Sequence, residues 1–135
     1  MKLVLDTNIY ADYAEGVEET VDFMASHGQS LYMPSVVVGE IHIGFMMGVR
    51  QQFNERRLRQ FVNRLDVEII PVDAEVARKY ALIYCSLKKK GSMIPINDVW
   101  IAACCMEVGG TLITRDRHFE AVEQIETLML TSQNR

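Results

Sequence analysis

Short apolar runs alternate along the chain with longer segments in which apolar residues recur at every third or fourth position. A short run bounded by polar or turn-forming residues is typical of a buried strand, whereas the longer spacing is typical of a helix with one buried face. From these runs we expect strands at Lys2–Leu5, Leu31–Met33, Val67–Ile70, Thr111–Thr114 and Ile125–Leu130.

Helices are expected between the strands. The segment from about Ile9 to Ala25 predicts one or two short helices, and Ser35, Asp73 and Asn97 are residue types that cap helix N-termini. The longer helices are expected at Ser35–Gly48, Gln51–Leu65, Asp73–Lys89 and Asn97–Val108. Strands that alternate with helices predict an α/β sandwich around a short parallel sheet of four or five strands.

Four acidic residues stand where this pattern turns from one element to the next. Asp6 ends the first apolar run and Asp116 ends the run near residue 112, while Glu40 and Asp98 lie near the starts of helices. Because the ends of parallel strands meet at one edge of a sheet, the four side chains are expected to converge there. Carboxylate oxygens are the ligands that Mg²⁺ and Mn²⁺ prefer, so this edge is a candidate site for a metal-dependent phosphodiesterase.

Each of these acids also has an ordinary structural interpretation. Asp98 could cap a helix through its dipole, and Asp6 and Asp116 could be turn residues. Glu40 is harder to explain in this way, because its neighbours from Val36 to Ile43 are largely apolar. Clustered carboxylates repel one another by about 4 kcal/mol per pair at 4 Å, so such a cluster needs protons or cations to persist.

The chain is acidic overall, with a net charge of −4 and a pI near 5.3, which argues against a general nucleic-acid coat. The charge is uneven, because Arg50, Arg56, Arg57, Arg59 and Arg64 crowd one segment and Lys88–Lys90 form a second basic group. These residues could be solvated helix faces, or the arginines could hold phosphates beside an acidic site. The sequence favours neither interpretation.

The length of 135 residues predicts a single domain, which we expect over residues 1–130, followed by a polar tail at 131–135. No apolar stretch approaches the roughly 20 residues of a membrane span, so no membrane association is expected. Cys85, Cys104 and Cys105 have no metal-binding spacing, and we interpret them as reduced core thiols of a cytoplasmic protein.

Two motifs near the C-terminal half, read together with the first acid, resemble the PIN-domain family and, within it, the small VapC-type toxins. The first runs from Ile96 through Asp98 to Ala103, and the second runs from Leu112 through Asp116 to Phe119. The string Leu5-Asp6-Thr7-Asn8 and the acid Glu40 complete the resemblance, which covers nearly the whole chain.

This resemblance implies a three-layer α/β/α fold and a Mg²⁺- or Mn²⁺-dependent endoribonuclease. It implies Asp6 and Asp98 as direct metal ligands, Glu40 as a ligand or a residue that positions the attacking water, and Asp116 as a ligand through water or of a second cation. The residues that it places beside the RNA substrate are Thr7, Asn8, Thr114 and Arg115. It also implies a homodimer and a cognate antitoxin that covers the site.

Three alternatives remain open from the sequence. The chain could be a non-catalytic PIN-like module that binds RNA or acts as a scaffold, although the presence of all four acids counts against this. A phosphatase of the haloacid dehalogenase type would need an aspartate where Asn8 stands. A DNA nuclease is not excluded by any residue. For His42 and His118 we favour packing or capping over catalysis.

Overall fold

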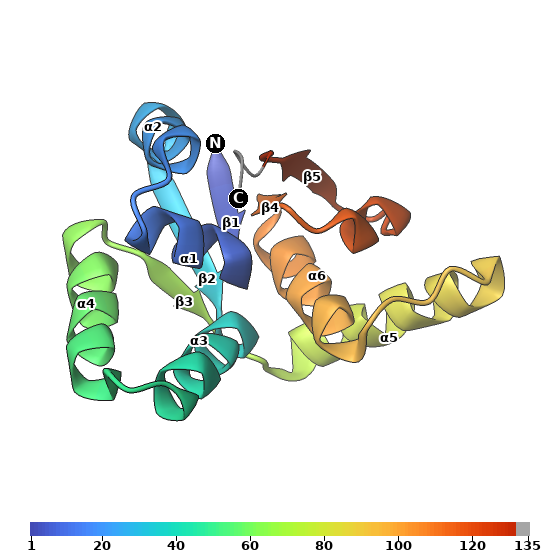
Figure 1. The fold of residues 1–135 in the computed structure, drawn as a ribbon. Helices are drawn as coiled ribbons and strands as arrows, with labels where there is room; N and C mark the ends of the chain where they lie inside the picture. Colours follow the sequence, from blue (N-terminus) through green and yellow to red (C-terminus); the bar gives the residue numbers. More distant parts are fainter. Residues whose placement is uncertain (132–135) are drawn as a thin grey trace.

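The structure, a computed structural model, describes residues 1–131, and its centre is a sheet of five parallel strands (Figure 1). The strands lie in the order β3-β2-β1-β4-β5. Their bounds are β1 Lys2–Leu5, β2 Ser30–Pro34, β3 Glu68–Ile70, β4 Thr111–Thr114 and β5 Glu126–Met129. The predicted short parallel sheet is therefore confirmed, and it has five strands, the larger of the two expected numbers.

Helices cover both faces of the sheet and give the expected three layers. Their bounds are α1 Thr7–Ala14, α2 Glu18–His27, α3 Ser35–Met47, α4 Gln51–Arg64, α5 Ala74–Lys90 and α6 Ile96–Val108. Figure 1 shows α1, α2 and α4 on one side of the strands, and α5 and α6 on the other. α3 contacts both α1 and α6, so it lies where the two helical layers meet.

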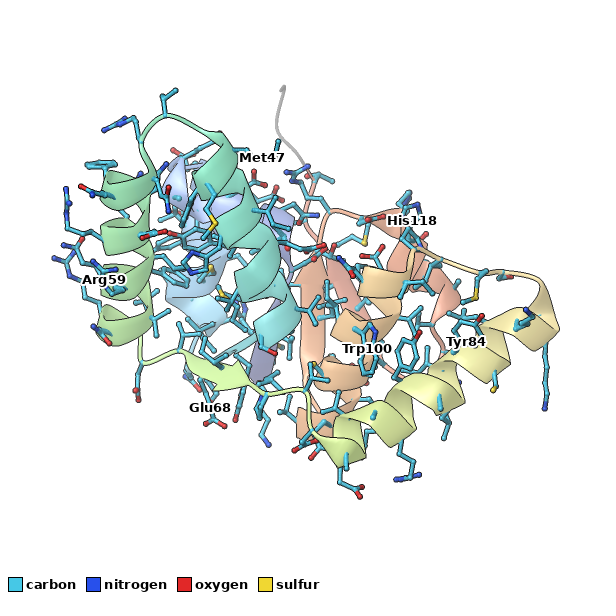
Figure 2. All side chains as sticks on the ribbon, turned by 90° about the horizontal axis from the view of Figure 1, so that it is seen from below. Met47, Arg59, Glu68, Tyr84, Trp100 and His118 are labelled. Atoms are coloured by element: carbon cyan, nitrogen blue, oxygen red, sulfur yellow. The ribbon has the colours of Figure 1, made fainter. Side chains whose placement is uncertain are left out.

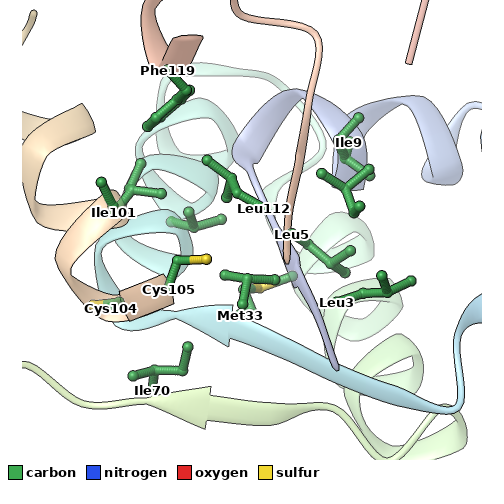
Figure 3. Close-up of a cluster of buried hydrophobic side chains, with 14 of the residues drawn as sticks. Leu3, Leu5, Ile9, Met33, Ile70, Ile101, Cys104, Cys105, Leu112 and Phe119 are labelled. Carbon is green, nitrogen blue, oxygen red and sulfur yellow. The ribbon is translucent and has the colours of Figure 1, made fainter. Parts of the chain in front are cut away.

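The central strand β1 explains why the first apolar run has no alternation. Leu3, Val4 and Leu5 are all fully buried, because each face of this strand is covered by helices. Figure 3 shows Leu3 and Leu5 packed on the side toward α1, with Leu112 on the opposite side toward α6. The core thus continues through the sheet into both outer layers.

The strand order reverses between β1 and β4, and this reversal positions the candidate site. The chain builds outward from β1 to β2 and β3, then returns through α5 and α6 to place β4 on the other side of β1. Loops that leave the carboxyl ends of two such neighbouring strands diverge to opposite faces, which opens a crevice. Asp6 follows β1 at this point, and Arg115 and Asp116 follow β4.

Two of the three predicted helix caps are wrong. Asp73 does cap α5, where its Oδ1 accepts a hydrogen bond from the Val76 amide at 2.9 Å. α3 and α6 instead begin directly after Pro34 and Pro95, which make no side-chain cap bond. The fixed φ of proline prepares the chain to enter a helix at the next residue. Asn97 therefore lies inside α6, with its side chain available for another partner.

Cys104 and Cys105 are fully buried in α6, as expected of core thiols, but Cys85 is exposed. The expectation for Cys85 is wrong because α5 packs on α6 along the stripe of Val76, Ile83 and Leu87, and Cys85 lies off that stripe. Within residues 1–131, no helix combines the length and the apolar character that crossing a bilayer requires. Of the predicted tail, positions 132–135 lie outside the described residues.

Candidate active site

Asp6 lies at the centre of the site and is almost completely buried, with only 4% of its surface exposed. It follows β1 directly and caps α1, because its Oδ1 accepts a hydrogen bond from the Thr7 amide at 2.8 Å. Its Oδ2 accepts hydrogen bonds from the Thr114 hydroxyl at 2.6 Å and from the Asn8 amide at 3.3 Å. Three donors therefore fix the orientation of this carboxylate.

Glu40 reaches the same region from the second turn of α3. Its Oε1 accepts a hydrogen bond from the Thr7 hydroxyl, and its Oε2 accepts one from the side-chain amide of Asn97 at 3.2 Å. The carboxylate is thus held between the first turn of α1 and the first turn of α6. Glu40 and Asp6 share Thr7 as a neighbour, so the two acids are coupled through one residue.

Asp98 and Asp116 form the other half of the site, with His118 between them. Asp98 lies in the first turn of α6, and Asp116 caps a 3₁₀ helix, Arg117–Ala121, through a 2.9 Å hydrogen bond from the His118 amide. The Nδ1 atom of His118 is 3.0 Å from Asp116 Oδ1 and 3.3 Å from Asp98 Oδ2. Ligand atoms of these three residues lie within 4.8 Å of one another.

The two halves are joined by Thr114. Its hydroxyl donates to Asp6 Oδ2 and accepts from the Asp116 amide at 2.9 Å. The four predicted acids are thereby linked in one hydrogen-bonded network at the carboxyl ends of β1 and β4. The geometry is a chain of hydrogen-bonded carboxylates, rather than four oxygens already at ligand distance from a single point.

Burial and mutual repulsion shape the electrostatics of the site. Burial raises the pKa of Asp6 against the lowering effect of the hydrogen bonds from Thr114 and Thr7, and the charges of Glu40 and Asp116 raise it further. Burial likewise raises the pKa of Asp98 to about 6, with Asp116 and Asp6 adding to the rise and His118 opposing it. Both acids thus resist ionisation in the protein without a cation.

Arg115 directly precedes Asp116, but its guanidinium does not bind the four acids. Its guanidinium binds both carboxylate oxygens of Asp12, with Nε–Oδ2 at 2.6 Å and Nη2–Oδ1 at 3.2 Å. The Arg115 amide donates to the Asn8 side-chain oxygen at 3.2 Å. Arg115 therefore ties the end of β4 to α1, and it leaves the charge of the four acids unneutralised.

A divalent cation fits this donor set. The groups on offer are carboxylate oxygens, which hard cations prefer. Burial, together with the neighbouring acids, raises the pKa values of Asp6 and Asp98, and a bound cation would offset this cost of ionisation. Asp98, Asp116 and His118 are already close enough to share one ion. The structure thus brings together all of the predicted acids and places Thr7, Asn8 and Thr114 directly against them.

Three residues of this network were missed by the sequence analysis. His118 contacts two acids, although packing or capping was favoured, and Asn97 holds Glu40 instead of capping a helix. Asp12 anchors Arg115 although nothing in its sequence context distinguishes it. A signal existed for His118 alone, since it lies two residues after an acid in a tight turn.

Known proteins share sequence and fold with this chain. The sequence profile described as PIN domain matches residues 3–125. The chain is similar to the protein named Ribonuclease VapC5 of Mycobacterium tuberculosis, with 31% identity over 88 residues, which cover 65% of this chain and 65% of that protein.

Two solved structures share the fold over nearly their whole length. One is VapBC2 from Rickettsia felis bound to a DNA fragment from its promoter, with a TM-score of 0.85, 23% identity, and coverage of 95% of this chain and 98% of that chain. The other is VapBC-5 from Mycobacterium tuberculosis, described as a member of the VapBC family of toxin-antitoxin systems. It has a TM-score of 0.69 and 25% identity, and the match covers 96% of this chain and 98% of that chain.

Proposed function

The chain belongs to the PIN domain family, and from this premise we propose that it is a metal-dependent endoribonuclease, the toxin of a toxin–antitoxin pair. The observation that carries the proposal is the network that joins Asp6, Glu40, Asp98 and Asp116 at the reversal of strand order. A relative that is named a ribonuclease supports the choice of reaction.

The cation in this proposal is Mg²⁺ or Mn²⁺. Asp98 and Asp116 would hold it, with Asp6 joined to Asp116 through Thr114 and Glu40 joined to Asp6 through Thr7. When bound, such an ion neutralises the carboxylates, acidifies a water ligand and offsets charge on a phosphoryl group. The protein supplies an acidic pocket whose carboxylates are oriented before any substrate arrives.

The other polar residues orient these acids. Thr7 and Thr114 each contact two members of the network, and Asn8 joins Asp6 to the Arg115 amide. We infer that these contacts keep the carboxylates in place while RNA binds. In the same proposal, Thr7 and Asn8 lie where the scissile phosphate would arrive. Cleavage would give RNA products that end in a 3′-hydroxyl and a 5′-phosphate.

The partners in the proposal are RNA, a cognate antitoxin and a second copy of the chain, in the cytoplasm. Support for the antitoxin comes from the similarity to VapBC-5, a structure described as belonging to a toxin-antitoxin family. An antitoxin that covers the crevice would block the access of RNA to the acids. Homodimerisation is an expectation from the family alone and is tested by measuring the molar mass of the purified protein.

Cleavage assays test the function. Purified protein with Mg²⁺ or Mn²⁺ is expected to cut labelled single-stranded RNA, to leave the matching DNA intact, and to stop when EDTA is added. Asp6→Asn should lower the rate by several orders of magnitude, while Asp22→Asn, an exposed aspartate on α2, should not change it.

Each other result has a defined meaning. Equal cleavage by wild type and Asp6→Asn would locate the activity outside this site. RNA binding without any cleavage would favour the non-catalytic module, and preferential cleavage of DNA would favour a DNA nuclease.

A further inference from the structure

The helix α4 carries a concentration of positive charge that the active site does not use. The segment from Arg50 to Arg64 holds five arginines and one acid, Glu55, in a chain with a net charge of −4. The Glu55 carboxylate accepts a hydrogen bond from Gln51 at 3.0 Å and lies 3.7 Å from His42 Nδ1. The arginines are therefore not neutralised by the one acid within their own segment.

Three of these arginines form a straight stripe. Arg50, Arg57 and Arg64 are separated by seven residues each, which is close to two helical turns, so they share one side of α4. Phe53 lies between the first two, with the Arg50 guanidinium 4.0 Å and the Arg57 guanidinium 5.8 Å from its ring centroid. The stripe thus combines guanidinium groups with an exposed aromatic ring.

Arg57 and Arg64, two members of the stripe, border a hollow between α1 and α4. The hollow has a volume of about 180 Å³ and is lined by aromatic rings and by two arginines of the stripe. Its lining includes Tyr10, Tyr13, Phe61, Arg57 and Arg64. Arg57 is already oriented there, because its Nη2 donates to the Ala14 carbonyl at 2.7 Å. Within residues 1–131 its guanidinium makes no other hydrogen bond, so its remaining N–H groups can bind another acceptor.

A second hollow lies next to this one. It has a volume of about 360 Å³, and its lining includes Thr7 and Glu40 of the acidic network together with Arg57 of the stripe. The two hollows share Tyr10, Ala14 and Arg57. A continuous depression therefore runs along α1 from the candidate active site to the arginine stripe, over a distance of about 10 Å from Thr7 to Ala14.

We propose that this depression binds single-stranded RNA beside the cleavage point, with Arg57 and Arg64 on phosphates that flank the scissile one. The inference rests on the nuclease function proposed above. A strand near four carboxylates is repelled by them, so its affinity has to come from groups outside the site. Guanidinium groups match phosphate oxygens in charge and shape, and the aromatic lining offers faces on which unstacked bases can lie.

Arg56 and Arg59 provide a matched control. They lie on the same helix but about a quarter turn or more away from the stripe. Figure 2 shows Arg59 projecting outward from α4, and it lines a different hollow near Ile69. The double variants Arg57→Gln/Arg64→Gln and Arg56→Gln/Arg59→Gln remove the same charge from the same helix, so they separate position from net charge.

RNA binding is measured by fluorescence anisotropy with a labelled single-stranded RNA of mixed sequence, in an Asp98→Asn background that does not cleave. The Arg57/Arg64 variant is expected to raise the Kd at least tenfold. It is also expected to flatten the slope of log K against log salt by about 1.4, because single strands contribute roughly 0.7 per phosphate contact. The Arg56/Arg59 variant should raise the Kd less than threefold.

The cleavage assay gives an independent reading in the otherwise wild-type protein. The Arg57/Arg64 variant should lose kcat/KM on a long RNA and retain the wild-type rate on a dinucleoside monophosphate, which has no flanking phosphates. Thermal melting of both variants checks that they fold.

Equal losses of RNA affinity in the two double variants, or no loss in either, would overturn the proposal. Unchanged RNA affinity with lost binding of a protein partner would assign the stripe to that partner and would also overturn it. The binding assay does not depend on cleavage, so it distinguishes failure of this inference from failure of the nuclease function.

Discussion

The hydroxyl of Thr114 donates a 2.6 Å hydrogen bond to Asp6 and accepts one from the amide of Asp116, so a single buried side chain joins the ends of β1 and β4. The two acids come from positions more than a hundred residues apart. Their relative placement depends on this one hydroxyl and on the pairing of the two strands.

Replacing Thr114 by valine keeps the shape of the side chain and removes the hydroxyl. The Asp116 amide and one oxygen of Asp6 then lose a partner in a buried place, which costs about 1–3 kcal/mol. The variant should melt several degrees lower and bind cations more weakly, because Thr114 lowers the pKa of Asp6. Thr111→Val, at the other end of β4, is the control, and an equal effect there would remove the special role of Thr114.

Cation binding should stabilise the wild type strongly. Free cation at 100 times its Kd adds about 2.7 kcal/mol to the free energy of unfolding, which corresponds to a rise in Tm of roughly 10 °C. Asp98→Asn should show a much smaller rise, because it lacks one of the close ligands. Calorimetric scans with and without Mn²⁺ make the comparison, and equal rises in both proteins would contradict the site.

The raised pKa of Asp98 predicts how stability depends on pH in EDTA. Its folded pKa of about 6 lies above the ordinary 3.8, so the folded protein binds more protons than the unfolded chain between these values. The contribution of Asp98 to the free energy of unfolding is therefore greatest below about pH 4 and falls as the pH rises toward 6. Above about pH 6 it no longer changes with pH.

The expected loss is on the order of 2–3 kcal/mol, measured by urea denaturation as the difference between wild type and Asp98→Asn. With saturating cation the trend should reverse, because the ion binds ionised carboxylates. A difference that does not vary between pH 4 and 6 would show that Asp98 titrates normally.

His118→Asn tests the residue that the sequence analysis passed over. The imidazole is about half exposed, so its loss should hardly change Tm, yet it contacts both Asp98 and Asp116. Residues that orient or join metal ligands typically change metal affinity by about 10- to 100-fold, and we expect a loss in this range by isothermal titration calorimetry. His27→Asn, at an exposed position on α2, should leave the metal affinity unchanged.

Arg115→Ala should destabilise the fold rather than act on substrate alone. It leaves Asp12, whose side chain is only 3% exposed, without its bidentate partner, a change that costs about 3–5 kcal/mol. The matched control is Arg117→Ala, whose partner Glu120 is well exposed and whose pair is worth at most about 1 kcal/mol. Similar unfolding free energies for the two variants would show that the Asp12 pair contributes little.

The fold was largely predictable because its signals are local. The unbroken apolar run of Lys2–Leu5 indicates a strand that is covered on both faces, and β1 is the central strand. Helix spacing placed α4, α5 and α6 to within a few residues of their observed bounds. The caps failed at Ser35 and Asn97, because Pro34 and Pro95 end the extended chain one and two residues before these polar residues.

The acids were predictable as a group, but the contacts between them were not. Asp6 and Asp116 each end a strand, which is a property of the sequence. The pairing of Asp12 with Arg115 depends on the register of β4 against β1 and on the turn of α1, which no local pattern encodes. The position of Asn97 against Glu40 likewise depends on how α3 meets α6.

The two strands at the reversal of strand order, β1 and β4, are synthesised far apart in time. During synthesis, β4, with Thr114 and the two residues that follow it, leaves the ribosome more than a hundred residues after β1 and Asp6. Until β4 has emerged, a nascent chain lacks Thr114 and Asp116, which hold one side of the site. The four acids can therefore join in one network only after β4 has been synthesised.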